Sequence, residues 1–171
     1  MLQLVVAGIL SGIVCGFAND REWLDGLRVL EVNVVVPLVY LAFVGGLLVF
    51  RGAGRSPPFL AWAALLVIAW IAAVRVGLAA LEWLEPDGIL RVGHGDLALA
   101  GAVAGLVGGA LHAAANAALL PATRTARAFL TVAAVGAVAG LSTAIDPNLW
   151  PLFIVWQGAV AGATGYVVEK A

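Results

Sequence analysis

Six long apolar stretches occupy most of this chain, and they limit its fold more than any other feature does. They are residues 2–18, 29–50, 58–83, 97–120, 126–145 and 149–168. A helix of about 20 residues crosses a hydrocarbon layer roughly 30 Å thick. Because 63% of the residues are hydrophobic and only 11% are charged, the chain is too apolar to cover its surface in water. The sequence therefore predicts an all-α integral membrane protein, a single domain over residues 1–171 that forms a bundle of about six transmembrane helices.

Residues that begin and end helices lie between the stretches. Ser56, which precedes two prolines, is typical of a helix start, and Asp96 is a candidate N-cap for the fourth helix. Pro121 follows the expected end of that helix, and Thr123 or Thr125 can cap the fifth. These polar residues have structural roles available to them, so they are weak indicators of chemistry.

The segment that follows the first stretch has a mixed pattern. Over residues 20–28, Trp23 and two leucines share one face and charged residues fill the rest, which predicts a short helix lying in the membrane interface. No Lys or Arg precedes Arg21, so the basic region that begins a signal peptide is missing. Residues 2–18 are therefore expected to remain as a helix of the protein.

The basic residues predict the orientation. In a six-helix arrangement, the 51–57 and 121–127 links and the C-terminus carry five Lys or Arg residues, whereas the opposite side carries three. Because cytoplasmic loops are enriched in Lys and Arg, we expect both termini in the cytoplasm and the protein in the cytoplasmic (inner) membrane. The opposite side holds nine of the ten acidic residues. A solvated surface with helix caps is the favoured interpretation of these acids, ahead of a mouth that concentrates cations.

Glycines recur at four-residue spacing in four of the six stretches. Small residues at this spacing let helix backbones approach closely where lipid supplies no hydrophobic drive. The first, fourth, fifth and sixth stretches are therefore expected to form the tight core, and the bulkier second and third to lie at the periphery. Cys15, the only cysteine, is interpreted as a small packing residue. The helix-packing glycines are Gly8, Gly12, Gly16, Gly101, Gly105, Gly109, Gly136, Gly140, Gly158 and Gly162.

Arg75 is the residue of the third stretch whose placement in the membrane costs the most free energy. It lies eight residues before the outer end of this stretch, which corresponds to a depth of roughly 12 Å at about 1.5 Å per residue. An arginine near the centre of a membrane helix costs about 2.5–3.5 kcal/mol, so Arg75 is predicted to be buried against other helices. Its candidate partners are Gln157, Glu31 and Asn33. A structural or snorkelling contact and a place on a substrate or ion path are equally supported.

His112 and Asn116 are four residues apart and share one face of the fourth stretch. Gly105 lies on the same face, so the two polar side chains are expected to point into the core, in its cytoplasmic half. A histidine there can bond to a neighbouring helix, relay protons, or ligate haem or a chlorophyll. Haem held by two histidines is disfavoured, because the other histidine, His94, lies in the opposite loop. An interhelical hydrogen bond is the favoured interpretation.

The sequence lacks the motifs of common enzyme classes. It has no Gly-rich phosphate loop, no HExxH, no GxSxG and no pair of intramembrane aspartates, so the chain is not predicted to be an enzyme. Its basic residues are too few for binding nucleic acid.

Two functions stay open for such a chain. The favoured one is a transporter, channel or permease subunit for a small solute or ion, because polar residues occur at several depths. The alternative is a non-catalytic scaffold or accessory subunit of a larger membrane complex. In either case the lipid bilayer is a partner, and the Gly-dense faces of so short a chain predict a homo-oligomer or a membrane-protein partner. The residues expected along a solute path are Arg75, Gln157, Glu31, Asn33, His112 and Asn116.

Overall fold

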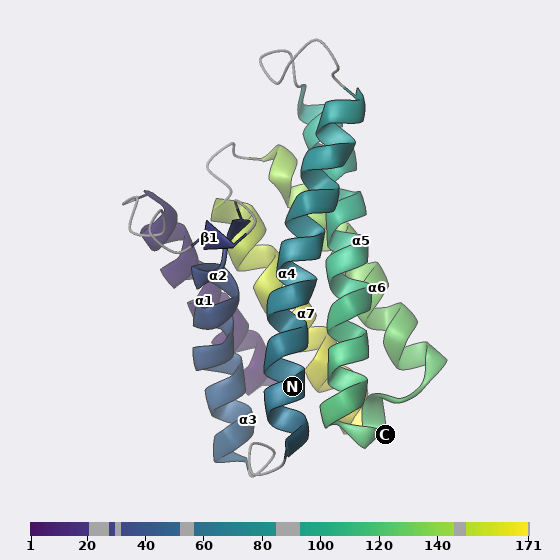
Figure 1. The fold of residues 1–171 in the computed structure, drawn as a ribbon. Helices are drawn as coiled ribbons and strands as arrows, with labels where there is room; N and C mark the ends of the chain where they lie inside the picture. The colour runs from purple at the N-terminus through teal and green to yellow at the C-terminus, as the bar shows by residue number, and fades with distance from the viewer. Residues whose placement is uncertain (21–27, 30–31, 52–56, 85–92, 146–149, 171) are drawn as a thin grey trace.

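The computed structural model describes residues 1–20, 28–29, 32–51, 57–84, 93–145 and 150–170, which form a bundle of helices (Figure 1). Residues 35–50 of the second apolar stretch form a continuous helical segment in which one π-helical piece separates two α-helical pieces. In chain order the elements are α1 (Leu2–Asp20), β1 (Arg28–Val29), β2 (Val32–Asn33), α2 (Val35–Tyr40), the π-helix η1 (Leu41–Gly45), α3 (Gly46–Phe50), α4 (Pro57–Leu84), α5 (His94–Leu119), the 3-10 helix η4 (Pro121–Thr123), α6 (Ala126–Gly140), the 3-10 helix η5 (Leu141–Ala144) and α7 (Trp150–Lys170).

Four of the described helices are long and apolar enough to cross a membrane. Two shorter apolar helices, Leu2–Ala18 and Val35–Phe50, accompany them. The predicted all-helical architecture is therefore confirmed in this coarser form. The four long spans are Phe59–Leu84, His94–Leu119, Ala126–Ala144 and Trp150–Lys170.

The second stretch begins differently from the prediction. Residues 29–34 were expected to be helical, but Val29 pairs with Val32 in a two-stranded antiparallel ladder, and the helix begins at Val35. The side-chain oxygen of Asn33 accepts a hydrogen bond from the Val35 amide at 2.8 Å. Asn33 thus satisfies a backbone donor at the helix start, and the β-branched Val29 and Val32 favour the extended backbone of the two strands. Of the predicted interfacial helix over 20–28, residues 21–27 lie outside the described part, and Arg28 belongs to β1.

The helix starts are explained by local capping. The carboxylate of Asp96 accepts a hydrogen bond from the Gly93 amide at 2.9 Å, so Gly93 is the N-cap of α5 and the predicted capping role of Asp96 is corrected to a position inside the first turn. The Thr125 hydroxyl accepts from the Ala128 amide at 3.1 Å and caps α6, as predicted. Thr123 instead donates to the Leu120 carbonyl. Ser56 lies outside the described residues.

Glycines bring α5 and α6 into backbone contact. A Cβ atom added to Gly105 would strike the carbonyl of Gly136, and one added to Gly140 would strike the carbonyl of Gly101. Because no side chain separates the two backbones, these helices lie closer together than larger residues would allow.

A second glycine contact joins the two ends of the chain. A Cβ atom on Gly12 of α1 would lie 2.5 Å from the carbonyl oxygen of Phe153 on α7, and one on Gly158 of α7 would lie 2.8 Å from Ile9. The amino group of Met1 forms an ion pair with Glu169, so both termini lie at the same end of the bundle (Figure 1, lower end). The tight glycine packing therefore consists of two helix pairs, α5 with α6 and α1 with α7.

Helix α4 is the least buried of the four long helices. Its inner face still contributes Trp62, which is 1% exposed, to an apolar cluster. This cluster lies near the terminal end, which is the end of the bundle that carries both chain termini. The segment from α2 to α3 contributes Val44 and Leu48 to the same cluster. The outer face of α4 is exposed as expected for a peripheral helix, but its inner face supplies part of the core, and so does the second segment.

Candidate functional site

A buried asparagine connects three helices in the bundle interior. Asn116 of α5 is 1% exposed. Its side-chain oxygen Oδ1 accepts a hydrogen bond from Nε1 of Trp62 on α4 at 3.0 Å. Its side-chain nitrogen Nδ2 donates to the Thr164 hydroxyl on α7 at 2.8 Å. These bonds give Asn116 the interhelical role expected for this face of α5.

His112 lies one helical turn from Asn116 and contacts two aromatic rings. Its Nε2 is 3.4 Å from the Tyr40 hydroxyl, and the tautomer decides which group donates. The imidazole meets the Tyr40 and Trp156 rings edge to face, at centroid separations of 5.5 and 6.3 Å. Tyr40 is the last residue of α2, directly before the π-helix η1. Short π-helical segments of this kind are frequent at functional sites.

The space beside His112 limits what this residue can bind. The adjoining cavity has a volume of about 20 Å³, which is room for about one water molecule. The His112 side chain is otherwise enclosed, since the residue is only 3% exposed. A macrocycle does not fit there, so the alternative in which His112 ligates haem or a chlorophyll is not compatible with this structure.

Gln157 forms a second polar centre on α7, seven residues before Thr164. Its side-chain oxygen accepts from the Ser11 hydroxyl at 2.5 Å, and its amide nitrogen donates to the Cys15 sulfur at 3.5 Å. Cys15 in turn donates weakly to the Val36 carbonyl at 3.8 Å. This centre therefore joins α1, α2 and α7.

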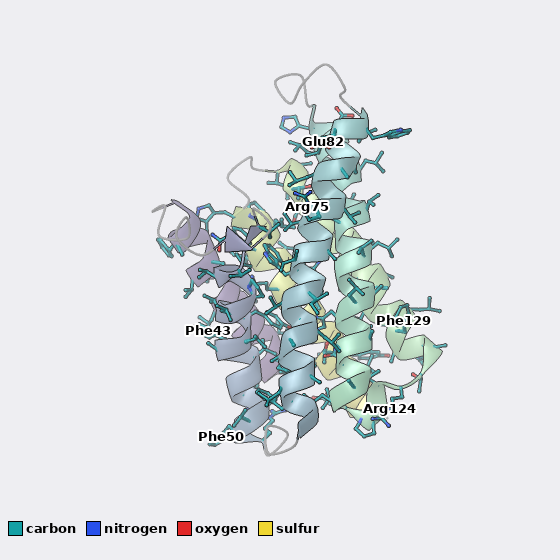
Figure 2. The ribbon with its side chains drawn as sticks, in the orientation of Figure 1. Phe43, Phe50, Arg75, Glu82, Arg124 and Phe129 are labelled. Atoms are coloured by element: carbon teal, nitrogen blue, oxygen red, sulfur yellow. The ribbon has the colours of Figure 1, made fainter. Side chains whose placement is uncertain are left out.

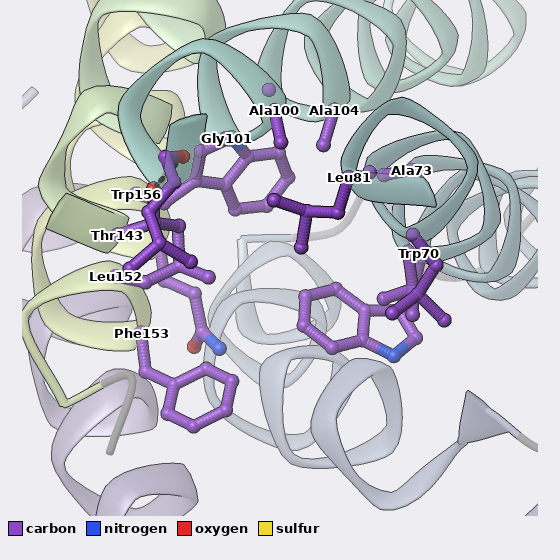
Figure 3. Close-up of a pocket in the computed structure, with 16 residues that line it drawn as sticks. Trp70, Ala73, Leu81, Ala100, Gly101, Ala104, Thr143, Leu152, Phe153 and Trp156 are labelled. Carbon is purple, nitrogen blue, oxygen red and sulfur yellow. Dashed lines mark hydrogen bonds between the residues drawn. The ribbon is translucent and has the colours of Figure 1, made fainter. Parts of the chain in front are cut away.

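A larger cavity of about 170 Å³ lies among α4, α5, η5 and α7. Figure 3 shows the rings of Trp70 and Trp156 on opposite sides of this space, with Phe153 below and the methyl groups of Ala100 and Ala104 above. Trp70, Trp156 and Gln157 line both this cavity and the small one beside His112. Polar groups therefore continue from the larger cavity through Gln157 and His112 to Asn116.

The structure brings together only some of the predicted path residues. Gln157, His112 and Asn116 are buried and lie in succession, as described above. Asn33 lies beside these three residues. Its backbone carbonyl oxygen accepts a hydrogen bond from Nε1 of Trp70 at 2.8 Å. Glu31 lies outside the described residues.

The predicted burial of Arg75 is wrong. Arg75 lies on α4 (Figure 2). Its side chain is exposed and lines neither of the two described cavities. Ile68 and Glu82, which lie seven residues to either side, are exposed as well. The depth of Arg75 along its helix was counted from the sequence, but depth does not determine which face of α4 meets the other helices.

Several residues of this region gave no clear sequence signal. Ser11, Cys15, Tyr40 and Trp62 are common residue types in apolar helices, and their roles depend on which helices meet. Thr164 could have been found, because it lies seven residues after Gln157 on the same helix face.

The chemistry available to this region is that of hydrogen bonding and apolar contact. Within the described ranges, every buried side-chain nitrogen and oxygen has a hydrogen-bond partner. The same ranges contain no group of three or more His, Cys, Asp or Glu side chains arranged to hold a metal ion. A comparison of the chain with protein-family models, with curated proteins and with solved structures gave no match.

Proposed function

We propose that this chain is an integral membrane protein whose six apolar segments all cross the cytoplasmic membrane, with both termini in the cytoplasm. The four long apolar helices support this arrangement, and the contact between Met1 and Glu169 agrees with an even number of crossings. The first segment, α1, has 19 residues, enough at about 1.5 Å per residue to span most of the hydrocarbon layer.

We further propose that the protein transports a small solute. The observation that carries this proposal is the pair of cavities that share Trp70, Trp156 and Gln157, followed by the polar residues His112 and Asn116. Binding sites in helical membrane proteins are commonly built between helices from apolar walls and a few polar groups. A solute would enter the larger cavity and pass Gln157 and then His112.

The terminal end of this path is closed by apolar side chains. Leu4, Val44, Leu48 and Leu119 pack together there around the Trp62 ring. Complete passage therefore requires these helices to separate, as in transporters that alternate between two access states. The π-helix η1 lies next to Tyr40 and is the part of the second segment where the regular hydrogen-bond pattern already changes.

A second function is favoured by a different observation. The buried polar side chains of the described part are all bonded within the chain, which is what an accessory or scaffold subunit needs. The exposed face of α4, which carries Arg75 and Glu82, is then a surface for a second copy or for another membrane protein. In this case the cavities have no role in transport.

The proposed topology predicts the labelling of two single-cysteine variants. In a Cys15→Ser background, Gly95→Cys lies at the exposed start of α5 and Ala126→Cys at the exposed start of α6. A membrane-impermeant thiol reagent applied to intact cells should label position 95, and position 126 only after the cells are opened. Equal labelling of both positions in intact cells would contradict the arrangement.

The proposed path predicts a difference in reactivity between two positions of α5. Ala104 lines the larger cavity, whereas Leu106 is 47% exposed on the outer surface of the bundle. A cysteine reacts as the thiolate, which forms in water and not against lipid. With a small neutral thiosulfonate reagent, Ala104→Cys should react at least about tenfold faster than Leu106→Cys. Equal rates at the two positions would contradict the proposed solute path and would favour the role as an accessory subunit.

A further inference from the structure

We infer that the larger cavity binds a neutral molecule the size of a single ring, bearing one hydroxyl or carbonyl group. This inference rests on the proposed function, because it names the class of solute that the path admits. It is drawn from the volume of the cavity, the character of its walls and the hydrogen-bonding capacity left on Gln157.

The volume sets the size of the ligand. The cavity measures about 170 Å³. A cavity of about 150 Å³ lined by Leu, Ile and Phe in an unrelated protein takes up benzene. The cavity described here therefore has room for one ring with one small substituent.

The walls set the polarity of the ligand. All the lining side chains are uncharged, and only Thr143 and Gln157 are distinctly polar. An ion placed against such walls loses its hydration without gaining a counter-charge, which costs several kcal/mol or more. The inference therefore favours a neutral solute over an ion.

Aromatic side chains give the cavity a defined shape. The Trp70 and Phe153 rings are 6.2 Å apart between centroids, with an angle of 39° between their planes. The hydrogen bond from Trp70 to the Asn33 carbonyl fixes the orientation of that indole. Figure 3 shows Trp156 across from Trp70, with the small side chains of Ala100 and Ala104 above the space. A planar ring can thus meet aromatic faces or edges without rearranging the walls.

Gln157 supplies the polar contact. Its amide has two donors and two acceptor positions, of which Ser11 uses one acceptor and Cys15 one donor. One N–H and one lone pair are left at a residue that is 1% exposed and lines the cavity. The Thr143 hydroxyl donates to the Leu97 carbonyl at 2.7 Å, so towards a ligand it acts as an acceptor. A ligand hydroxyl can therefore both donate and accept in this cavity.

The test compares three probes of one shape on the purified full chain in lipid nanodiscs. The probes are 4-fluorobenzyl alcohol, 4-fluorobenzylamine and 4-fluorobenzoate, which at neutral pH are uncharged, cationic and anionic. Binding is read from the broadening of the fluorine NMR line. We expect the alcohol to bind at least about tenfold more tightly than either charged probe. A tenfold ratio of dissociation constants corresponds to a difference of about 1.4 kcal/mol in binding free energy, which is small for the burial of a charge.

Two matched variants separate the cavity from uptake into the bilayer. Ala104→Phe fills the cavity, whereas Ala114→Phe adds the same ring to an exposed position of the same helix. The alcohol signal should be lost in the first variant and kept in the second. If Ala104→Phe does not fold, Ala100→Leu fills the cavity from the adjoining turn. Equal signals in the filled and control variants, or binding of a charged probe as tight as that of the alcohol, would overturn the inference.

The outcome is distinguishable from a failure of the proposed transport. Fast modification of the cysteine at position 104 without binding of the alcohol leaves the path intact and rejects the solute class. Binding of the alcohol with slow modification at that position rejects the path and assigns the cavity to a ligand-binding subunit. In a Gln157→Leu variant, 4-fluorobenzyl alcohol and 4-fluorotoluene should bind with about equal affinity, because the polar contact is removed.

Discussion

Gly140→Ala is expected to lower the free energy of unfolding by about 3 kcal/mol or more. The added methyl group would overlap the carbonyl oxygen and carbon of Gly101 on the neighbouring helix. A flexible side chain could turn away from such a contact, but a helix backbone cannot, because its carbonyl is held by the hydrogen bonds of α5. The two helices must therefore separate, and the contacts along the whole α5–α6 surface weaken together.

The measurement is reversible unfolding in detergent, followed by circular dichroism. Gly46→Ala is the matched control, because a Cβ atom at Gly46 of α3 meets nothing within 4 Å. Alanine is the better helix former, so this control should be neutral or stabilising by up to about 1 kcal/mol. A Gly140→Ala variant within about 0.5 kcal/mol of the parent would show that the α5–α6 contact does not limit stability.

The bounds of most helices could be predicted because they depend on local properties. An apolar run, a capping threonine such as Thr125 and a proline such as Pro121 act within a few residues of their position. The prediction failed at Val29 and at residues 32–34, where the valines are as compatible with a strand as with a membrane helix. The hydrogen bond of Asn33 to the Val35 amide decides where that helix begins, and apolar length alone does not contain this information.

The pairing of the helices could not be predicted in the same way. The glycine spacing indicates which faces are small, but not that α1 meets α7 or that α5 meets α6, since each face is similar to the others. For the same reason the partners of Gln157, which are Ser11 and Cys15 on α1, were not identified from the sequence.

The difference between Arg75 and Gln157 shows the limit most clearly. Both were placed at a similar depth from their positions along the chain, yet Arg75 is exposed and Gln157 is 1% exposed. Helix α4 turns Trp62, Leu66, Ala69 and Ala73 inward, and this leaves the Arg75 face outside. The direction of a side chain thus depends on which face of its helix is better packed, and the cost of the charge at that depth did not override it.

Asn116→Leu is expected to lower the free energy of unfolding by about 1–3 kcal/mol, because it leaves the indole N–H of Trp62 buried without its acceptor. Trp62 is 1% exposed, so water cannot replace the lost bond at 3.0 Å without opening the apolar cluster around the ring. Thr164 suffers less, since its hydroxyl also donates to the Val160 carbonyl at 3.0 Å and keeps that bond. The loss is therefore attributed mainly to one stranded donor.

A double-mutant cycle isolates that donor. Trp62→Phe removes the N–H and keeps an aromatic ring, so the double variant with Asn116→Leu should recover about 1 kcal/mol relative to the sum of the single changes. The same cycle with Thr164→Val should show a smaller coupling, because Thr164 retains its own backbone partner. The free energies come from the unfolding measurements used for Gly140. Additive effects of Asn116→Leu and Trp62→Phe would mean that the hydrogen bond between Trp62 of α4 and Asn116 of α5 contributes nothing to stability.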